Sequence, residues 1–336
     1  MKSLFYIFIF SSVISHYGCE KVLLEKDLAS SNPLDNFEYL WREADKKYSY
    51  FDLKAIDWNV IKEKYRDSIS DDMSEEQLFD VLSGMLKELR DDHVNLFSPF
   101  NTSVYNASLN YPKSYNARTI DEHYLLDASY TGGFKHGFID SGRIAYIRYS
   151  SFTSQVTEQD LNIILSRYSD TKGLILDIRE NGGGDIFNIP LILERFTLER
   201  TLSAYTITRN GESHSDFTEP SPFYLNQYDD GVVYDKSVVV LCDRGSYSAS
   251  TFFSLLTKAF DHIKLIGDTT GGGGGLPNGG QLPNGWTYRF SVTQLLDLNY
   301  ENYAESGVPP DEAVQFNWND LSHDEILDKA IIELNL

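Results

Sequence analysis

VVVLCDRGSYSAS, residues 238–250, changes from an apolar run into a short polar turn that is rich in serine. The apolar run predicts a buried β-strand, and residues 251–260 are typical of a helix that follows the turn. Such a turn lies at the carboxyl end of a sheet, beside backbone N–H groups that have no partner within the helix. A serine in it (Ser246, Ser248 or Ser250) either caps the helix or is a candidate nucleophile.

The strand–turn–helix pattern occurs elsewhere in the chain. GLILDIR (173–179) is a near-continuous apolar run, typical of a strand that is covered on both faces. The turn ENGGGD (180–185) follows it, and we expect a helix over 186–196. Further strands are predicted at 124–126, 144–147 and 263–266, and a helix at the C-terminal end, around 327–334. Alternating strands and helices indicate an α/β fold with a layered core.

Residues 35–98 are predicted to form a small N-terminal helical domain. Apolar residues recur at helical spacing in its first part, at Phe37, Leu40, Trp41, Ala44 and Tyr48. A second helix is expected over 58–65. A third, over 78–89, follows the capping-box sequence SEEQ (74–77) and runs directly into RDDHVNL (90–96), which contains His93.

Composition limits the partners of this protein. The chain has 336 residues, of which 41% are hydrophobic, so it is long enough to form a sizeable folded core. Its formal net charge of −21 argues against a nucleic-acid partner, because binding a phosphate backbone requires a basic surface. Histidine, cysteine and glutamate residues do not cluster at metal-binding spacings, so no metal site is predicted.

The first residues indicate export. Lys2 precedes a short apolar run, which is typical of a secretory signal and too short for a stable transmembrane helix. Cys19 follows Gly18 directly after that run, as in a bacterial lipobox. We therefore expect a signal peptide over 1–19, a lipid anchor at Cys19 as the only membrane attachment, and a polar tether over 20–34. The expected location is periplasmic or at the outer membrane, with plain cleavage of the signal as the alternative.

The glycine-rich turn after the strand at 173–177 is a second candidate for chemistry. Gly182, Gly183 and Gly184 have no side chains, so their backbone N–H groups could approach a substrate carbonyl, as could the amide of Ala249 after the serine turn. Phosphate binding is the alternative. However, these glycines lack the GxGxxG spacing, and residues 271–275 lack the Lys-Ser/Thr of a P-loop, so no nucleotide cofactor is predicted.

Four motifs occur in order and carry a family resemblance: GLILDIRENGGG (173–184), SAS (248–250), IGDTTGG (266–272) and GVPPD (307–311). Together they resemble the catalytic core of the tail-specific (C-terminal processing) and tricorn-core serine peptidases. The resemblance covers most of residues 35–315 and implies a ClpP/crotonase-like layered core over 121–336. A linker over 99–120 would join this core to the helical domain.

The resemblance also implies catalytic roles. The first serine of SAS, Ser248, is the expected nucleophile. Tail-specific relatives use a lysine base about twenty-five residues later, where this chain has Gly273, so a serine–lysine dyad is not expected. The tricorn type takes its base from a histidine at the end of the helical segment, which is His93 here. The resemblance places an orienting glutamate shortly before GVPPD: Glu305, with Glu301 as the alternative. Gly183 and Ala249 are the expected oxyanion donors.

These roles predict a serine endopeptidase that acts on peptides or unfolded proteins and needs no cofactor. Only about 50 residues separate His93 from the strand at 144–147, roughly half of what a small domain needs, so we expect no complete PDZ domain there. A non-catalytic ligand- or peptide-binding protein on the same scaffold is the alternative. The sequence does not indicate an oligomeric state.

Overall fold

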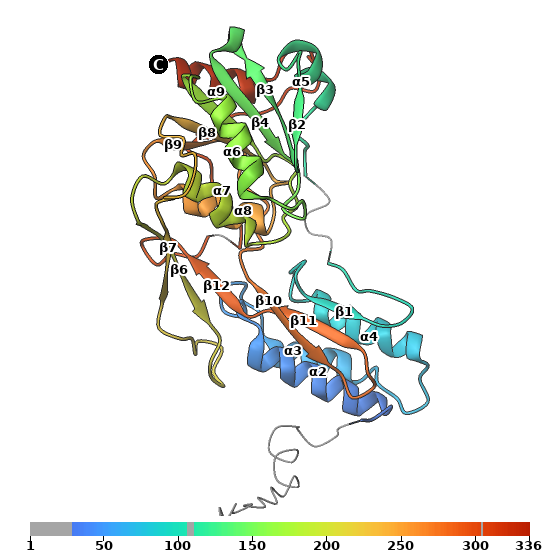
Figure 1. The fold of residues 1–336 in the computed structure, drawn as a ribbon. Coiled ribbons are helices and arrows are strands. Elements are labelled where there is room, and N and C mark those ends of the chain that lie inside the picture. The colour runs from blue at the N-terminus through green and yellow to red at the C-terminus, as the bar shows by residue number, and fades with distance from the viewer. Residues whose placement is uncertain (1–28, 106–110, 304) are drawn as a thin grey trace, which may run out of the picture.

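The computed structural model describes residues 29–105, 111–303 and 305–336, which form two lobes (Figure 1). The expected signal peptide and Cys19 lie outside these residues. The larger lobe contains a seven-stranded sheet and helices α5 to α9. The smaller lobe contains helices α2 to α4 and a three-stranded sheet. Among the described residues, no helix has the length and apolar character needed to cross a membrane.

The seven-stranded sheet is the frame of the larger lobe. Its order is β13 (Glu312–Ala313), β9 (Ile263–Gly267), β8 (Val238–Cys242), β5 (Gly173–Asp177), β4 (Ile144–Tyr149), β3 (Phe134–Ile139) and β2 (Ser129–Thr131). The five strands from β13 to β4 are parallel, and β3 and β2 extend the sheet antiparallel. The carboxyl ends of β5 and β8, where the two predicted turns begin, are therefore neighbours.

Helices cover both faces of this sheet. One face packs against α6 (Glu158–Arg167), α7 (Asn188–Leu193), which continues as the 3-10 turn η3 (Glu194–Phe196), and α8 (Ala249–Thr257). The other face packs against α5 (Ala117–His123) and α9 (Glu325–Asn335). Leu174 and Leu176 of β5 point to the first face and Ile175 to the second, as the two-residue period of a strand requires. The predicted layered α/β fold is confirmed.

The smaller lobe consists of α2 (Pro33–Lys47), α3 (Trp58–Arg66) and α4 (Glu75–Lys87) packed on an antiparallel sheet. The predicted capping box at the start of α4 is present. The sheet has the order β1 (Asn95–Phe97), β11 (Thr287–Ser291) and β10 (Pro277–Gln281).

Residues 277–291 return from the C-terminal half of the chain to complete the smaller lobe. Trp286, Tyr288 and Phe290 contribute buried side chains to its core, because three short helices alone leave their apolar faces uncovered. The expected boundaries, with a helical domain over 35–98 and a separate core over 121–336, therefore differ from the structure.

A third sheet lies between the lobes. It has the order β12 (Thr293–Leu296), β6 (Thr201–Thr208) and β7 (Ser221–Leu225). The loop between β6 and β7 reaches the smaller lobe, where Arg209 donates to the carbonyl oxygen of Tyr48 at 3.2 Å. In the same loop, His214 Nε2 lies 2.8 Å from Asp45 Oδ1. These contacts hold the two lobes together.

Two local predictions differ from the structure. Residues 124–126 follow helix α5 and are not a strand, because the backbone N–H groups of Tyr124 and Leu125 both donate to the carbonyl oxygen of Ile120 in that helix. The expected linker over 99–120 is partly packed. Ser114 and Thr119 are buried against the larger lobe, and Ser114 Oγ donates to Asp243 Oδ2 at 2.7 Å. The remaining short element is the 3-10 turn η2 (Asp140–Gly142).

Candidate active site

Ser248 occupies a strained turn between β8 and α8. Its backbone has φ 57° and ψ −114°, a region that non-glycine residues rarely adopt, and its side chain makes no helix-capping hydrogen bond. The neighbouring serines have structural partners, since Ser246 Oγ donates to the carbonyl oxygen of Ile178 and Ser250 Oγ to that of Asn181. Of the three serines, Ser248 is the one that the turn leaves available for chemistry.

His93 reaches Ser248 from the smaller lobe. Its Nε2 lies 2.9 Å from Ser248 Oγ, although the two residues are 155 positions apart in the sequence. The loop that carries His93 follows α4 and is fixed by Asp91, whose Oδ1 accepts the backbone N–H of His93 at 2.8 Å. Asp91 Oδ2 accepts the hydroxyl of Ser291, from β11, at 2.8 Å. The structure thus brings the expected nucleophile and the expected base within hydrogen-bond distance.

The surroundings of His93 favour a neutral imidazole. Burial lowers the pKa of His93 below its ordinary value, the carboxylate of Asp91 opposes this shift, and the positive charge of Arg289 adds to it. A neutral imidazole has a free ring nitrogen that accepts a proton. The pair can therefore transfer the serine proton to Nε2.

Glu305, the expected orienting acid, makes its ion pair with another residue. Its Oε1 lies 2.6 Å from Lys54 Nζ, and its side chain is 8% exposed. Among the described residues, neither Glu305 Oε2 nor His93 Nδ1 has a hydrogen-bond partner, although both atoms are buried. The two side chains nevertheless lie along one glycine segment, since the backbone of Gly275 acts to raise the pKa of His93 and that of Gly274 to lower the pKa of Glu305. Direct contact between His93 and Glu305 is not observed.

Burial and charge make Glu305 an unusual carboxyl group. Burial raises its pKa to about 8, the neighbouring Asp91 contributes to the increase, and Lys54 opposes it. The alternative acid, Glu301, is exposed, and its backbone contacts lie within a turn that contains Asp297. Of the two expected glutamates, Glu305 is the buried one.

The two expected oxyanion donors differ in whether their backbone N–H groups already have an acceptor. The amide of Ala249 has no acceptor among the described residues, so it is available to a substrate. The amide of Gly183 donates to Asn181 Oδ1 at 3.0 Å. Gly183 nevertheless lies against the serine turn at φ +91°, and a Cβ atom there would be 2.9 Å from the nitrogen of Ala249. A substrate oxygen would therefore compete with Asn181 for the N–H of Gly183.

A cavity of about 330 Å³ opens beside Ser248 and His93. Part of its wall is apolar and comes from Ile186, Phe252, Leu276 and Pro277, and the charged side chains of Asp92 and Arg289 also line it. Gly273 lies in the same wall, and a Cβ atom there would be 2.4 Å from the ring of Tyr247. A side chain at position 273 would therefore have to displace the ring of Tyr247.

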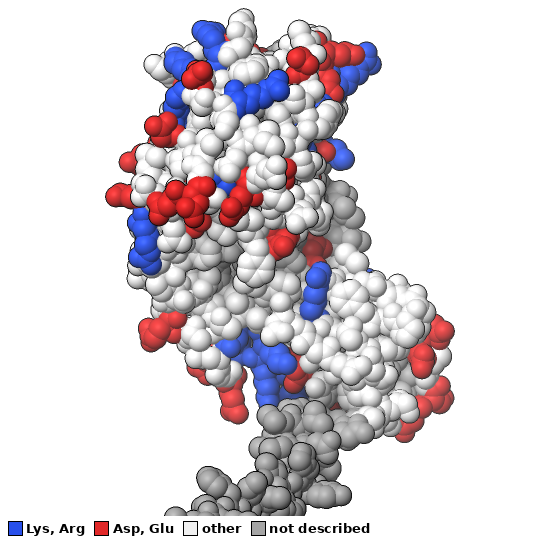
Figure 2. Space-filling model, in the orientation of Figure 1, with Lys and Arg blue, Asp and Glu red and all other residues white. Residues whose placement is uncertain are grey.

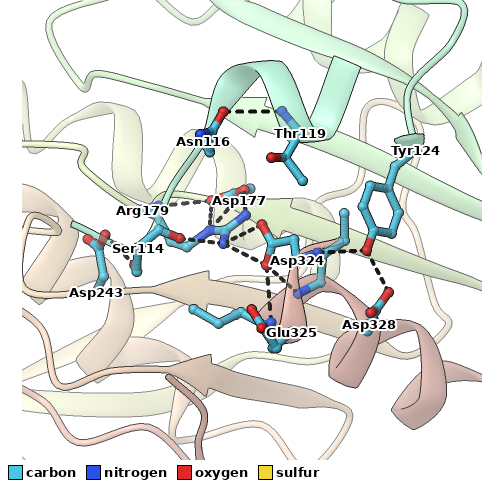
Figure 3. Close-up of polar contacts among 12 residues, drawn as sticks. Ser114, Asn116, Thr119, Tyr124, Asp177, Arg179, Asp243, Asp324, Glu325 and Asp328 are labelled. Atoms are coloured by element: carbon cyan, nitrogen blue, oxygen red, sulfur yellow. Dashed lines mark hydrogen bonds and ion pairs between the residues drawn. The ribbon is translucent and has the colours of Figure 1, made fainter. Parts of the chain in front are cut away.

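A buried carboxylate ties the serine turn to the glycine-rich turn. Asp243 Oδ1 accepts the backbone N–H groups of Glu180, Gly245 and Ser246 at 2.8, 2.9 and 3.1 Å. Glu180 has a positive φ of 55°, as Ser248 does, so one acid supports both strained turns. Through Ser114, Asp243 connects to a second buried group, the ion pairs of Arg179 with Asp177 and Asp324 (Figure 3).

Sequence reasoning did not identify Lys54, Asp91 or Asp243 as site residues. Asp243 could have been recognised as an acid directly between a buried strand and the serine turn, a position where carboxylates often accept backbone N–H groups. Asp91 lies two positions before His93, but no local pattern there indicates that its carboxylate fixes the loop. Lys54 had no local signal, because its partner lies 251 positions away in the sequence, at Glu305.

Comparison with known proteins identifies the family of this chain. Residues 143–314 match the sequence model of peptidase family S41, and residues 32–87 match that of the tricorn protease C1 domain. The fold is that of the S41 peptidases, with N-terminal helices. The chain belongs to peptidase family S41.

Individual relatives agree with this assignment. A crystal structure of a putative peptidase from Parabacteroides merdae is 38% identical, covers 91% of this chain and 98% of that one, and has a TM-score of 0.85. The tricorn protease structure shares the fold at 18% identity and a TM-score of 0.56, covering 91% of this chain and 37% of that one. Carboxy-terminal processing protease CtpB of Bacillus subtilis is 23% identical over 176 residues, which are 51% of this chain and 34% of that protein. The chain thus spans about a third of the length of this curated relative.

We predict that the Asp243 carboxylate is a major source of stability for both turns. Asp243→Ala leaves three N–H groups, two of them buried, without their acceptor, so we expect the free energy of unfolding to fall by about 3 kcal/mol or more. Asp243→Asn keeps an acceptor oxygen and should lose less than half of that amount. Urea unfolding of the two variants and the wild type measures the difference. Equal losses for Ala and Asn would contradict the role of the acceptor oxygen.

Proposed function

We propose that this chain is a serine endopeptidase that cleaves peptides or unfolded proteins through an acyl-enzyme. The observation that carries the proposal is the 2.9 Å distance between His93 Nε2 and Ser248 Oγ beside an open cavity. A serine hydroxyl is a weak nucleophile until a base within hydrogen-bond distance takes its proton. A buried histidine whose pKa is lowered is suited to this task.

In the first half-reaction, Ser248 Oγ attacks the scissile carbonyl carbon while its proton passes to His93 Nε2. The carbonyl π electrons move to the oxygen, and the resulting oxyanion accepts the N–H of Ala249. The N–H of Gly183 is the second donor once it exchanges Asn181 for the substrate. One such donor contributes about 3 kcal/mol to transition-state stabilisation. Collapse of the intermediate breaks the C–N bond, and His93 returns the proton to the leaving amine.

In the second half-reaction, water replaces the amine. The water oxygen attacks the acyl carbon while His93 takes a proton from that water. His93 then donates this proton to Ser248 Oγ as the ester bond breaks. Each half-reaction passes through an imidazolium on His93. We propose that the ionised form of Glu305, which lies along the same glycine segment, stabilises this imidazolium electrostatically without the direct contact of a conventional triad.

The proposal predicts that Ser248→Ala abolishes both cleavage of an unfolded protein substrate and labelling by a fluorophosphonate probe. The loss of kcat should be at least about 10⁴-fold, as for other serine-peptidase nucleophiles. Ser250→Ala, which removes a neighbouring structural hydroxyl, is the matched control and should still be labelled. A wild-type protein that is neither labelled nor active, yet binds peptides, would instead support the non-catalytic binding alternative.

A pH dependence follows from Glu305. His93 is already neutral near pH 7, but a carboxyl group whose pKa is about 8 is mostly protonated there, so kcat/KM should rise as pH increases through about 8. Glu305→Gln should remove this rise and lower kcat about 100-fold or more, because the imidazolium loses its counter-charge. Glu301→Gln, which changes an exposed glutamate, should keep the wild-type profile. An unchanged profile in Glu305→Gln would exclude Glu305 from catalysis.

We also propose that the chain is exported and anchored through a lipid on Cys19, on the strength of the apolar run and the Gly-Cys pair at its end. In a bacterial host, the wild-type protein should fractionate with membranes and incorporate labelled palmitate. Cys19→Ser should be soluble and unlabelled, with unchanged activity. Recovery of the unlabelled wild type in the soluble fraction would favour plain cleavage of the signal.

A further inference from the structure

Lys54, near the candidate active site, contacts both the segment that carries Glu305 and the loop that carries His93. Its Nζ is 2.6 Å from Glu305 Oε1, in the larger lobe. It also donates to the carbonyl oxygen of Arg90 at 3.0 Å, and it lies 4.0 Å from Asp91 Oδ2. Arg90 and Asp91 belong to the loop that carries His93. One ammonium group thus contacts the loop of the base and the proposed orienting acid.

The location of Lys54 makes its charge effective. Its side chain is 14% exposed, and those of Asp91 and Glu305 are 0% and 8% exposed, so bulk water screens these charges only weakly. Three tyrosines and the backbone of Gly274 complete the surroundings of Glu305, and none of them carries a positive charge. The groups that face Glu305 are Lys54, Asp91, Tyr48, Tyr50, Tyr247 and Gly274.

Two acids, Asp91 and Glu305, lie close to one cation, Lys54. Two carboxylates in one buried place repel each other, and one of them takes up a proton unless a positive charge compensates. Asp91 has N–H and O–H donors from His93 and Ser291, whereas Glu305 Oε2 has no donor among the described residues. Among the described residues, Lys54 is therefore the cation that pairs with the Glu305 carboxylate.

We propose that Lys54 is a positioning residue that favours the ionised form of Glu305 through their ion pair and ties the loop carrying His93 to the larger lobe. This inference rests on the proposed function and adds to it a cation supplied by the smaller lobe. The active site is then complete only when the two lobes are docked, because the acid comes from one lobe and its counter-ion from the other.

Substitution of Lys54 tests the proposal through the pH profile. Lys54→Met should move the rise in kcat/KM to higher pH by about one unit or more, because Glu305 loses its nearest positive charge. Lys54→Gln, which can still donate a hydrogen bond, should show the same shift, whereas Lys54→Arg should stay within about threefold of the wild type. Lys62→Met is the matched control, because Lys62 also pairs with a glutamate and stacks on an aromatic ring in the smaller lobe. It should leave the profile unchanged.

A double-mutant cycle separates positioning from a purely structural role. In a Glu305→Gln background, Lys54→Met should change kcat less than about threefold, because the group through which Lys54 acts is no longer charged. A loss in that background as large as in the wild type would overturn the proposal, as would equal shifts for the Lys54 and Lys62 variants.

A direct titration distinguishes failure of this inference from failure of the proposed function. NMR of ¹³C-carboxyl-labelled glutamate in the Ser248→Ala protein measures the pKa of Glu305 without any turnover. Lys54→Met should raise that pKa, and an unchanged value would overturn the inference even if the enzyme is active. Conversely, suppose that Lys54→Met raises the pKa of Glu305 but that the wild-type protein neither cleaves substrate nor is labelled. That result would support the charge coupling and reject the peptidase. Lys54→Gln provides the same measurement if Lys54→Met does not fold.

Discussion

The hydrogen bond between His93 and Ser248 joins two lobes, and much of the structure serves to hold it. Ser248 belongs to a sheet whose parallel strands fix the serine turn, whereas His93 follows a helix of the other lobe. A hydrogen bond of this kind contributes only about 1 kcal/mol to stability, so it cannot dock two lobes by itself. Docking comes from the chain itself, which returns to the smaller lobe as β10 and β11, and from the β6–β7 loop, which contacts Tyr48 and Asp45.

Carboxylates on the surface and carboxylates in the interior of this protein have different surroundings, and Glu305 differs from both groups. Acidic side chains are spread over both lobes on the face shown in Figure 2, in keeping with a net charge of −21. Inside the molecule, by contrast, most buried carboxylates have specific cationic or N–H partners. Asp177 and Asp324 share Arg179, and Asp243 is surrounded by N–H donors. Glu305, with a single ion pair and one buried oxygen without a partner, is the least well compensated of these groups.

Local patterns predicted the parts of this structure that depend on neighbours in the sequence. The buried strands β5 and β8, the capping box of α4 and the serine turn were all visible as short motifs, and the family resemblance then selected Ser248 and His93. The strands β10 and β11 were missed, although Trp286, Tyr288 and Phe290 alternate with polar residues as in a half-buried strand. Their helical partners lie some 200 positions earlier, and no local pattern identifies such a partner. For the same reason the ion pair between Lys54 and Glu305 could not be foreseen.

The return of residues 277–291 to the smaller lobe also determines when that lobe can form. Asn95 of β1 pairs with Arg289 of β11 across 194 positions, so contacts of very long range close its sheet. During synthesis, the helices α2 to α4 leave the ribosome long before the strands that cover them, and their apolar faces stay without this cover until nearly the whole chain has emerged. The histidine loop is fixed to β11 through Asp91 and Ser291, so it is held in place only after that point. The order of translation therefore delays assembly of the complete site until the chain is almost finished.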